Sequence, residues 1–342
     1  MGDDLLQFVS SFEGGDGLRV EETLGGGYVR LRVSEAERRQ AKHDIRCVED
    51  AVIELLRNAR DAGAHHIFVA TSREGDVRTI CVIDDGSGIP QSMHQRVFDA
   101  RVTSKLDSML MDRWGVHGRG MALYSIAQNA LEARVMSSGV GMGTSLRCTF
   151  DVSTIQERAD QSTWPTVTNA NGDFAVRGPR NILRASVEFA LEAKDVCNVY
   201  VGSPSEIIAT LRTHGNCGMD AARIVDGPSM AKDARELRHV SEALGIEMSQ
   251  RTAHRIMKNQ IAPLVNVRSK LIGTRRAKAI DSSTVMERTL SLSQEDKELF
   301  AHLMEQDFAA IAKKYYVIPT GRPRITAGKG RITVTFEYLD DD

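Results

Sequence analysis

The sequence lacks any long hydrophobic run. No apolar stretch approaches the roughly 20 residues that a membrane-spanning helix needs, and the acidic start, MGDDLLQFVSSFEGGDG, has no signal-peptide pattern. The composition, 42% hydrophobic and 26% charged, is that of an ordinary globular protein. We therefore expect a cytoplasmic protein with no membrane partner, and its 342 residues suffice for two or three domains.

Cysteine is scarce and scattered. The five cysteines never take C-x-x-C spacing, which argues against a disulfide framework and against a zinc site. We predict that they are core thiols of a reduced protein. His43, His65 and His66 have metal-binding chemistry, but without matching cysteine or carboxylate spacing we interpret them as helix-edge and loop residues.

Internal repeats and low-complexity tracts are also absent, so hydrophobic patterns divide the chain. Apolar residues at helical spacing predict a helix at 44–62, with Asp44 as its N-cap and Gly63 as its stop. A second helix is predicted at about 120–131. β-Branched and alternating runs predict strands at 28–33, 65–72, 78–84, 133–138 and 145–152.

The pattern changes beyond residue 150. A polar, turn-rich stretch at 155–177 indicates an insertion or a boundary. The elements expected after it are helices at 179–193, near 230–244, near 249–259 and at 293–315, with strands at 198–203 and 331–339. We predict three domains: residues 1–215, with the main motifs in 44–150, then a small basic helical domain at 216–290, and a helix and strand at 291–342.

The helix at 44–62 carries a polar stripe. Glu54, Asn58 and Asp61 are spaced by four and three residues, so they share one helical face, and the opposite face is apolar. A solvated surface is the usual meaning of such a stripe. The motifs that follow it in the sequence favour a functional one.

Three glycine-rich segments come next: DDGSGIP at 84–90, GVHGRGMAL at 115–123 and GMGTSL at 141–146. Asp84 ends a strand and can accept a hydrogen bond from an adenine amino group, while Gly86 and Gly88 let the backbone approach the ring. In the second segment, glycines precede a helix, so free backbone N–H groups and the helix dipole favour an anion there.

The polar stripe and the glycine-rich segments together predict an ATP site with Mg²⁺. Glu54 supplies a general base for a water molecule. Asn58 supplies an oxygen ligand for Mg²⁺, which needs few protein ligands because it keeps several waters and binds the phosphates. Four such pieces in one order over about ninety residues are far more specific than a lone glycine motif.

These segments resemble the motifs of the GHKL ATPases, the superfamily of gyrase, chaperones, histidine kinases and MutL. ELLRNARDAGA at 54–64 resembles the N-box, and its DAGA ending is most similar to MutL-type ATPases and to the B subunits of type IIB topoisomerases such as topoisomerase VI. VIDDGSGIP and GVHGRGMAL resemble the two glycine boxes, VTSKL at 102–106 the lid segment, and GTSL the last strand motif. The resemblance covers roughly residues 40–150 and implies an α+β fold, a two-layer α/β sandwich with a mixed sheet.

The resemblance also implies roles for individual residues. Glu54 would be the general base and Asn58 the magnesium ligand. Asp84 would contact adenine, with Gly88 beside the base, and Thr144 would reach adenine through a water molecule. The remaining nucleotide-site residues that we expect are Asp61, Gly86, Ile89, the lid residues Thr103, Ser104 and Lys105, and the phosphate-loop residues Gly115, His117, Gly118, Gly120 and Met121.

The second glycine box departs from the MutL pattern. MutL proteins carry F-R-G-E-A-L there, whereas VHGRGMAL is more similar to topoisomerases and chaperones. His117 fits a phosphate contact and an exposed loop residue equally well. Lys105 fits a lid role better than that of an ordinary surface lysine, because it stands in T-S-K before a glycine box.

A one-signed basic stretch lies in the C-terminal part, within a chain of net charge −2. It overlaps the end of ALGIEMSQRTAHRIMKNQI, which weakly resembles a helix-turn-helix module. Residues 251–280 contain no acidic residue, so contacts with DNA phosphates and a solvated surface are about equally favoured. Its basic residues are Arg251, Arg255, Lys258, Arg268, Lys270, Arg275, Arg276 and Lys278.

The sequence thus predicts an ATPase that acts on DNA as an ATP-gated, dimerising clamp, similar to a topoisomerase VI B subunit or to MutL, with a topoisomerase A-like or other protein subunit as a possible partner. The alternative is a signalling or defence switch with a protein partner and no DNA. A histidine kinase is disfavoured because no paired-helix phosphoacceptor pattern precedes the N-box, and a chaperone because a large substrate domain is not evident. In the resembled families a second domain lends a lysine to the γ-phosphate; Lys329 could replace it, although a hairpin turn explains Lys329 better.

Overall fold

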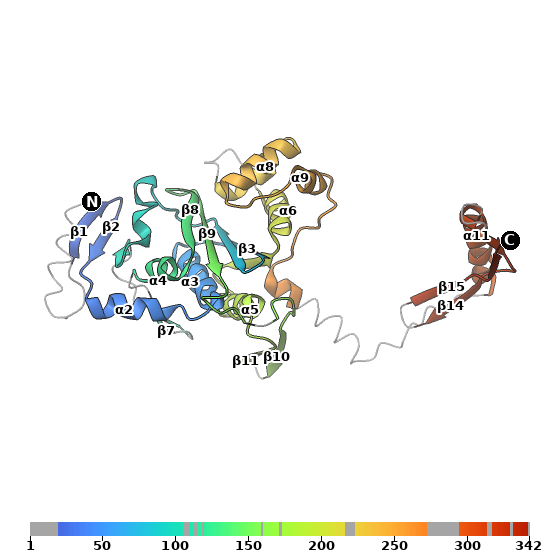
Figure 1. The fold of residues 1–342 in the computed structure, drawn as a ribbon, viewed down its shortest axis with the longest axis horizontal. Helices are drawn as coiled ribbons and strands as arrows, with labels where there is room; N and C mark the ends of the chain where they lie inside the picture. The colour runs from blue at the N-terminus through green and yellow to red at the C-terminus, as the bar shows by residue number, and fades with distance from the viewer. Residues whose placement is uncertain are drawn as a thin grey trace. The chain divides into compact units, whose positions relative to one another are not determined.

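The computed structural model divides the chain into two compact units, Met1–Gly273 and Thr274–Asp342, which are described separately (Figure 1). The structure describes residues 20–104, 110–112, 115–117, 120–158, 160–170, 173–215, 223–271, 294–312, 317–328 and 331–340.

The main sheet of the first unit is mixed. Its strands are β3 (His66–Glu74), β4 (Val77–Asp84), β8 (Glu132–Gly139), β9 (Gly143–Asp151) and β12 (Asn198–Gly202), in the order β12-β3-β4-β9-β8. β12 runs parallel to β3, and the other neighbours are antiparallel. The predicted strands and the mixed sheet are therefore confirmed.

Three helices cover one face of this sheet (Figure 1). They are α3 (Val48–Asp61), α4 (Ala122–Asn129) and α5 (Ile182–Glu192). The apolar stripe of α3 is buried there, with Val52, Leu55 and Leu56 at most 1% exposed. Burying aliphatic side chains of this size stabilises the fold by roughly 1.5–3 kcal/mol each, so this packing sets which face of α3 is left for a site.

The start of α3 differs from the prediction. Asp44 ends a separate helix, α2 (Glu35–Asp44), and Cys47 is the N-cap of α3. The physical reason is a contact that is remote in sequence: Cys47 bridges to Gln156, and the Val48 N–H donates to the Gln156 carbonyl at 3.1 Å. This pairing keeps the chain extended between the two helices.

A second helical layer covers the other face of the sheet (Figure 1). It comprises α6 (Pro204–His214), the short helices η3 (Ile224–Asp226) and α7 (Gly227–Met230), α8 (Ala234–Ala243) and α9 (Gln250–Met257). Leu237 and Ile256 from this layer share a core with Phe68 and Ile83 from the sheet. The α+β class is confirmed, and this layer adds to the two layers that the sequence predicted.

A smaller sheet includes the first residues of the predicted lid segment, 102–106. It consists of β1 (Val20–Gly25), β2 (Tyr28–Leu31) and β5 (Val102–Thr103), in the order β1-β2-β5. α2 follows it and begins at Ser34, whose hydroxyl accepts from the Glu37 N–H while the Glu37 carboxylate accepts from the Ser34 N–H. This capping box stabilises the helix start next to the smaller sheet.

Short elements connect these layers. η1 (Gln91–Met93) and η2 (Arg96–Phe98) follow β4, and β6 (Leu110–Asp112) pairs with β7 (Gly115–His117). The polar stretch at 155–177 contains a hairpin, β10 (Thr166–Ala170) with β11 (Asp173–Arg177), that the sequence analysis did not predict. Cys47, Cys81, Cys148 and Cys197 are buried thiols, as predicted, and Cys217 lies outside the described residues.

The second unit contains α11 (Gln294–Ala312) and four strands among its described residues. β13 (Val317–Pro319) pairs with β16 (Tyr338–Asp340), and β14 (Arg324–Gly328) pairs with β15 (Arg331–Thr335). The Phe308 and Phe336 rings stack at 4.2 Å between centroids. Lys329 lies outside the described residues.

The chain divides at Gly273, so residues 223–271 belong to the first unit and pack on its sheet. The three domains expected from the sequence stay a prediction. Among the helices that the structure describes, none is long and apolar enough to cross a membrane.

Candidate nucleotide site

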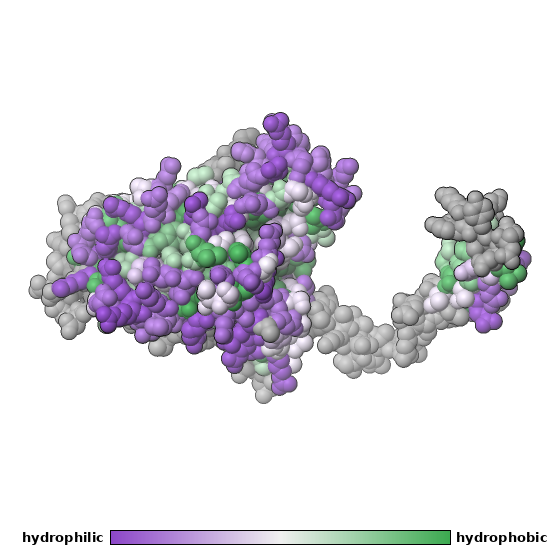
Figure 2. Space-filling view, in the orientation of Figure 1, coloured by the Kyte–Doolittle hydropathy of each residue, from purple (hydrophilic) through white to green (hydrophobic). Residues whose placement is uncertain are grey.

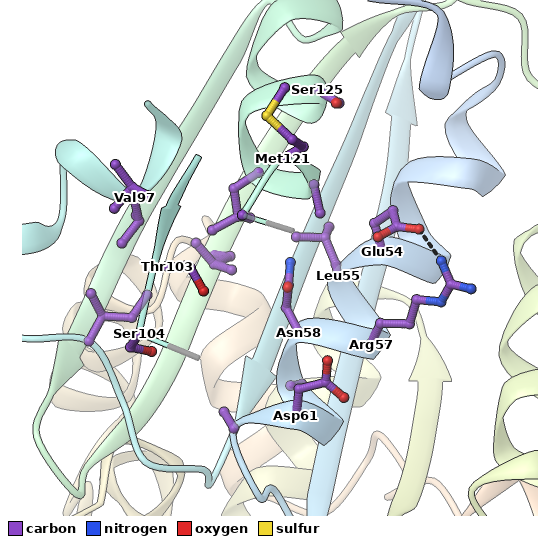
Figure 3. Close-up of a pocket in the computed structure, with 18 of the residues that line it drawn as sticks. Glu54, Leu55, Arg57, Asn58, Asp61, Val97, Thr103, Ser104, Met121 and Ser125 are labelled. Atoms are coloured by element: carbon purple, nitrogen blue, oxygen red, sulfur yellow. Dashed lines mark hydrogen bonds and ion pairs between the residues drawn. The ribbon is translucent and has the colours of Figure 1, made fainter. Parts of the chain in front are cut away.

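A cavity of about 470 Å³ lies between α3, the ends of β4 and β9, the lid strand β5 and the start of α4. The structure brings most of the predicted site residues to its wall (Figure 3). These are Glu54, Asn58, Asp61, Asp84, Gly88, Ile89, Thr103, Ser104, Gly120, Met121 and Thr144. They come from five segments that are remote in sequence.

The other predicted residues are not among the described residues that line the cavity. The Gly86 N–H donates to Asp84 Oδ1 at 2.8 Å, so Gly86 shapes the turn that holds Asp84. Gly115 and His117 lie in β7. Lys105 and Gly118 are outside the described residues, so their expected roles stay predictions.

The polar stripe of α3 faces the cavity. In Figure 3, Asn58 points from α3 toward Thr103 and Met121. Its Nδ2 atom is buried and has no hydrogen-bond partner among the described residues. The oxygen and nitrogen of a side-chain amide are assigned from their surroundings. The observation is therefore that one buried end of the Asn58 amide points at the cavity, where a ligand can be its bonding partner.

Glu54 is paired with an arginine that the sequence analysis overlooked. Arg57 Nη1 donates to Glu54 Oε1, and the side chains are 4% and 21% exposed, respectively (Figure 3). Both residues line the cavity. Their spacing of three residues is a signal that the sequence did contain, because it places both side chains on one flank of the helix.

Asp84 and Thr144 are cross-strand partners at the ends of β4 and β9, and both are 4% exposed. Thr144 Oγ1 lies 3.2 Å from Ser138 Oγ, which accepts from the Ile89 N–H at 2.7 Å and donates to the Gly143 carbonyl at 2.8 Å. This network orients the Thr144 hydroxyl, and the strand register places Asp84 beside Thr144 in the cavity wall.

Two glycines keep the backbone close to the cavity. Gly88 has φ +72°, and a Cβ built there would lie 1.9 Å from the Gly139 carbonyl oxygen. Gly120 has φ +66°, and its Cβ would lie 2.9 Å from the Val102 carbonyl oxygen. Larger residues are therefore excluded, and the N–H groups at the start of α4 stay accessible to an anion.

Further wall residues come from segments that the motifs do not include. Tyr28 and Arg101 line the cavity, and Arg101 forms an ion pair with Glu37 of α2. Burial raises the pKa of Tyr28 more than its hydrogen bond with Ser104 lowers it. No local pattern marks these residues, because only the packing of the smaller sheet brings them to the cavity.

Asp85, next to Asp84, has different partners. Its Oδ1 accepts from the His65 and His66 N–H groups at 2.7 and 2.8 Å, and its Oδ2 lies 3.1 Å from His66 Nδ1. Burial alone would raise the pKa of Asp85, but the hydrogen bonds from His66 and His65 outweigh it, so this pKa lies below the usual value. Arg223 Nη1 lies 3.6 Å from the same carboxylate.

The basic stretch divides into three parts. Arg251, Arg255 and Lys258 are exposed on and just after α9, and in Figure 2 the surface over α8 and α9 is largely hydrophilic. Arg268 donates to the Lys194 carbonyl and to Asn198 Oδ1, and the Lys270 ammonium lies 3.6 Å from the centre of the Trp164 ring. Arg275, Arg276 and Lys278 lie outside the described residues. Among the described residues of the stretch, the three at α9 and Lys270 are exposed, and their contact with DNA stays a prediction.

Comparison with known families agrees with this geometry. Residues 45–174 match the family of histidine kinase-, DNA gyrase B- and HSP90-like ATPases. This segment is a GHKL ATPase domain.

Over part of the same domain the chain is similar to DNA mismatch repair proteins MutL. It is 40% identical to MutL of Parabacteroides distasonis over 99 residues, which are 28% of this chain and 16% of that protein. It is 43% identical to MutL of Thermus aquaticus over 84 residues, 24% of this chain and 15% of the relative. The aligned part is therefore less than a fifth of each relative.

Proposed function

We propose that this protein binds ATP with Mg²⁺ and hydrolyses it in the cavity beside α3. The observation that carries the proposal is the convergence of Glu54, Asn58 and Asp84 on one cavity wall. The buried amide of Asn58 and the two glycine positions that exclude any side chain fit such a ligand.

Each wall residue has a chemical task in this proposal. Asp84 accepts the adenine amino group, with Thr144 beside it. Asn58 would hold Mg²⁺, which would supply charge neutralisation of the phosphates when bound. The N–H groups at Gly120 and Met121 face the phosphates. Glu54 takes the proton from the attacking water.

We further propose that ATP controls contact of the protein with DNA, through a clamp that closes and dimerises when ATP is bound. The similarity to MutL and the exposed basic residues of α9 support a DNA partner. The layer that carries α9 is bonded to the nucleotide strands: the Leu244 carbonyl accepts from Ser145 Oγ at 2.7 Å and from Cys81 Sγ at 3.2 Å. Ser145 follows Thr144 directly, so a displacement of Thr144 on adenine binding would reach this layer through the hydrogen bond between Ser145 and Leu244.

A switch with a protein partner and no DNA is the second candidate, and the cavity suits it equally. A topoisomerase A-like subunit would instead be a partner of the DNA clamp. The exposed basic residues of α9 favour DNA over this candidate, because a phosphate backbone needs only basic side chains at an accessible surface.

The decisive experiment measures magnesium-dependent ATP turnover by the wild type and by Glu54→Ala. We expect wild-type turnover, and a loss of about 10²- to 10⁴-fold in the variant with ATP binding retained. Equal turnover of the two proteins would refute the assignment of Glu54. DNA retention at low salt that falls steeply as salt rises would separate the clamp from the protein-partner switch.

A further inference from the structure

The ion pair between Glu54 and Arg57 has an unusual setting. Arg57 is 4% exposed, although an arginine on a helix ordinarily keeps its charged end in water. By contrast, the intrahelical pair of Arg39 and Glu35 has both side chains more than 70% exposed. Burying a guanidinium is costly unless a carboxylate compensates it. Helix stability alone therefore does not explain why the ion pair of Arg57 and Glu54 is buried.

Arg57 and Asn58 both line the cavity, but they leave α3 in different directions. In Figure 3, Asn58 points toward Thr103 and Met121, whereas Arg57 lies on the other flank of the helix and reaches Glu54 from there. The guanidinium binds Oε1 of Glu54. A carboxylate can accept bonds at both oxygens, so a cation on this flank is compatible with a water molecule on the cavity side.

We propose that Arg57 is the positioning residue of the Glu54 general base. The inference rests on the proposed hydrolysis. A buried cation beside the carboxylate favours its charged form, which is the form that can accept a proton. The ion pair also limits the rotamers of Glu54, so the base is already oriented before water and phosphate meet it. Arg57 acts through Glu54 and need not touch the nucleotide.

The test compares three substitutions of Arg57 with a control pair. Arg57→Met removes the cation, Arg57→Gln keeps a donor without charge, and Arg57→Lys keeps the charge. Arg184→Met is the control, because Arg184 forms a similarly shielded intrahelical pair with Glu188 but does not line the cavity. The measurements are ATP affinity, kcat and the pH dependence of kcat for each folded variant.

We expect Arg57→Met and Arg57→Gln to lower kcat about 10- to 100-fold, as when the partner that orients a metal ligand is removed. ATP affinity should stay within a few-fold of wild type. A carboxylate without its cation is protonated more easily, so the acid limb of the kcat profile should move to higher pH. Arg57→Lys should recover most of kcat and the wild-type limb, and Arg184→Met should change neither.

Wild-type kcat and an unmoved acid limb in a folded, ATP-binding Arg57→Met or Arg57→Gln variant would overturn the inference. Failure of all three Arg57 variants to fold would overturn it too, because Arg57 would then serve the fold rather than the base. The Glu54→Ala variant distinguishes failure of the proposed hydrolysis mechanism from failure of the role of Arg57. If Glu54→Ala hydrolysed ATP as fast as wild type, the hydrolysis mechanism would be refuted. If Glu54→Ala were inactive while Arg57→Met kept wild-type kcat, only the role of Arg57 would be refuted.

Discussion

Asp84 and Asp85 are adjacent in the chain, yet their carboxylates have separate environments. Asp84 lines the nucleotide cavity opposite Thr144, whereas Asp85 accepts bonds from the start of β3 and contacts Arg223. We therefore expect substitution of Asp84 to change ATP affinity and substitution of Asp85 to change the pH dependence of stability. Each variant serves as the control for the other.

Asp84→Asn should weaken ATP binding about 10- to 100-fold. A charge-assisted hydrogen bond in a closed site is worth roughly 1.5–3 kcal/mol, and an amide in its place is a poorer acceptor for the adenine amino group. Isothermal titration calorimetry measures the loss. The Asp85→Asn control should bind ATP nearly as well as wild type; unchanged affinity in Asp84→Asn would remove Asp84 from the site.

Asp85 should make stability depend on pH. Its pKa is lowered in the folded state by the bonds from His66 and His65, so the stabilisation is present above the usual carboxyl pKa. It is lost as pH falls through the lower folded value. Urea unfolding from pH 7 down to pH 3 should show a smaller acid-induced loss in Asp85→Asn than in wild type. Parallel curves for the two proteins would contradict the prediction.

Asn58→Ala should lose the magnesium dependence of ATP binding. Alanine removes the one oxygen ligand that the α3 face offers in this proposal, and Mg²⁺ then depends on phosphates and water alone. The measurement is ATP affinity with and without Mg²⁺, with Glu54→Ala as the comparison that should keep the metal effect. A magnesium effect as large as in wild type would exclude Asn58 as a ligand.

Gly88→Ala should disrupt the cavity. The added Cβ would lie 1.9 Å from the Gly139 carbonyl oxygen, so the turn or the end of β8 must shift. Gly75→Ala is the matched control: Gly75 also has positive φ, +56°, but a Cβ there has no heavy atom within 4 Å. The control should cost only about 1–2 kcal/mol of backbone strain and keep ATP binding. Thermal unfolding and calorimetry compare the two variants, and equal stability and ATP affinity would contradict the requirement for glycine at position 88.

Replacing Arg251, Arg255 and Lys258 together by alanine should weaken DNA binding for every sequence alike. The slope of log affinity against log salt should flatten by about 0.9 for each phosphate that the variant no longer neutralises. A triple substitution of the exposed arginines Arg158, Arg177 and Arg180 is the control for net charge. An unaltered slope in the α9 variant, or equal effects of both variants, would favour the protein-partner switch.

Much of the site could be predicted from local pattern. The spacing of Glu54, Asn58 and Asp61 follows from helical periodicity, and the buried apolar stripe opposite them fixes which face remains for a ligand. Glycines that the backbone conformation requires, such as Gly88, stand out because other residues are strained there. These signals depend on neighbours in the chain, so one sequence suffices to find them.

Contacts between remote segments were not predictable in this way. Asp44 looked like a helix N-cap, but pairing of Cys47 with Gln156 moved the start of α3. The Lys270 ammonium lies over the Trp164 ring, a neighbour that no local pattern indicates. The partner of each of these residues depends on which side chain lies near it in the folded chain. A single sequence does not show that proximity.

The sequence by itself determined the GHKL motifs, the α3 stripe and the strands of the main sheet, because periodicity and backbone preference are local properties. Only the tertiary structure decided which of two adjacent aspartates faces the cavity, that α6 to α9 cover the second face of the sheet, and that a buried Arg57 is paired with Glu54. Those outcomes come from the competition of segments for the same apolar surface and from the need of each buried charge for a partner.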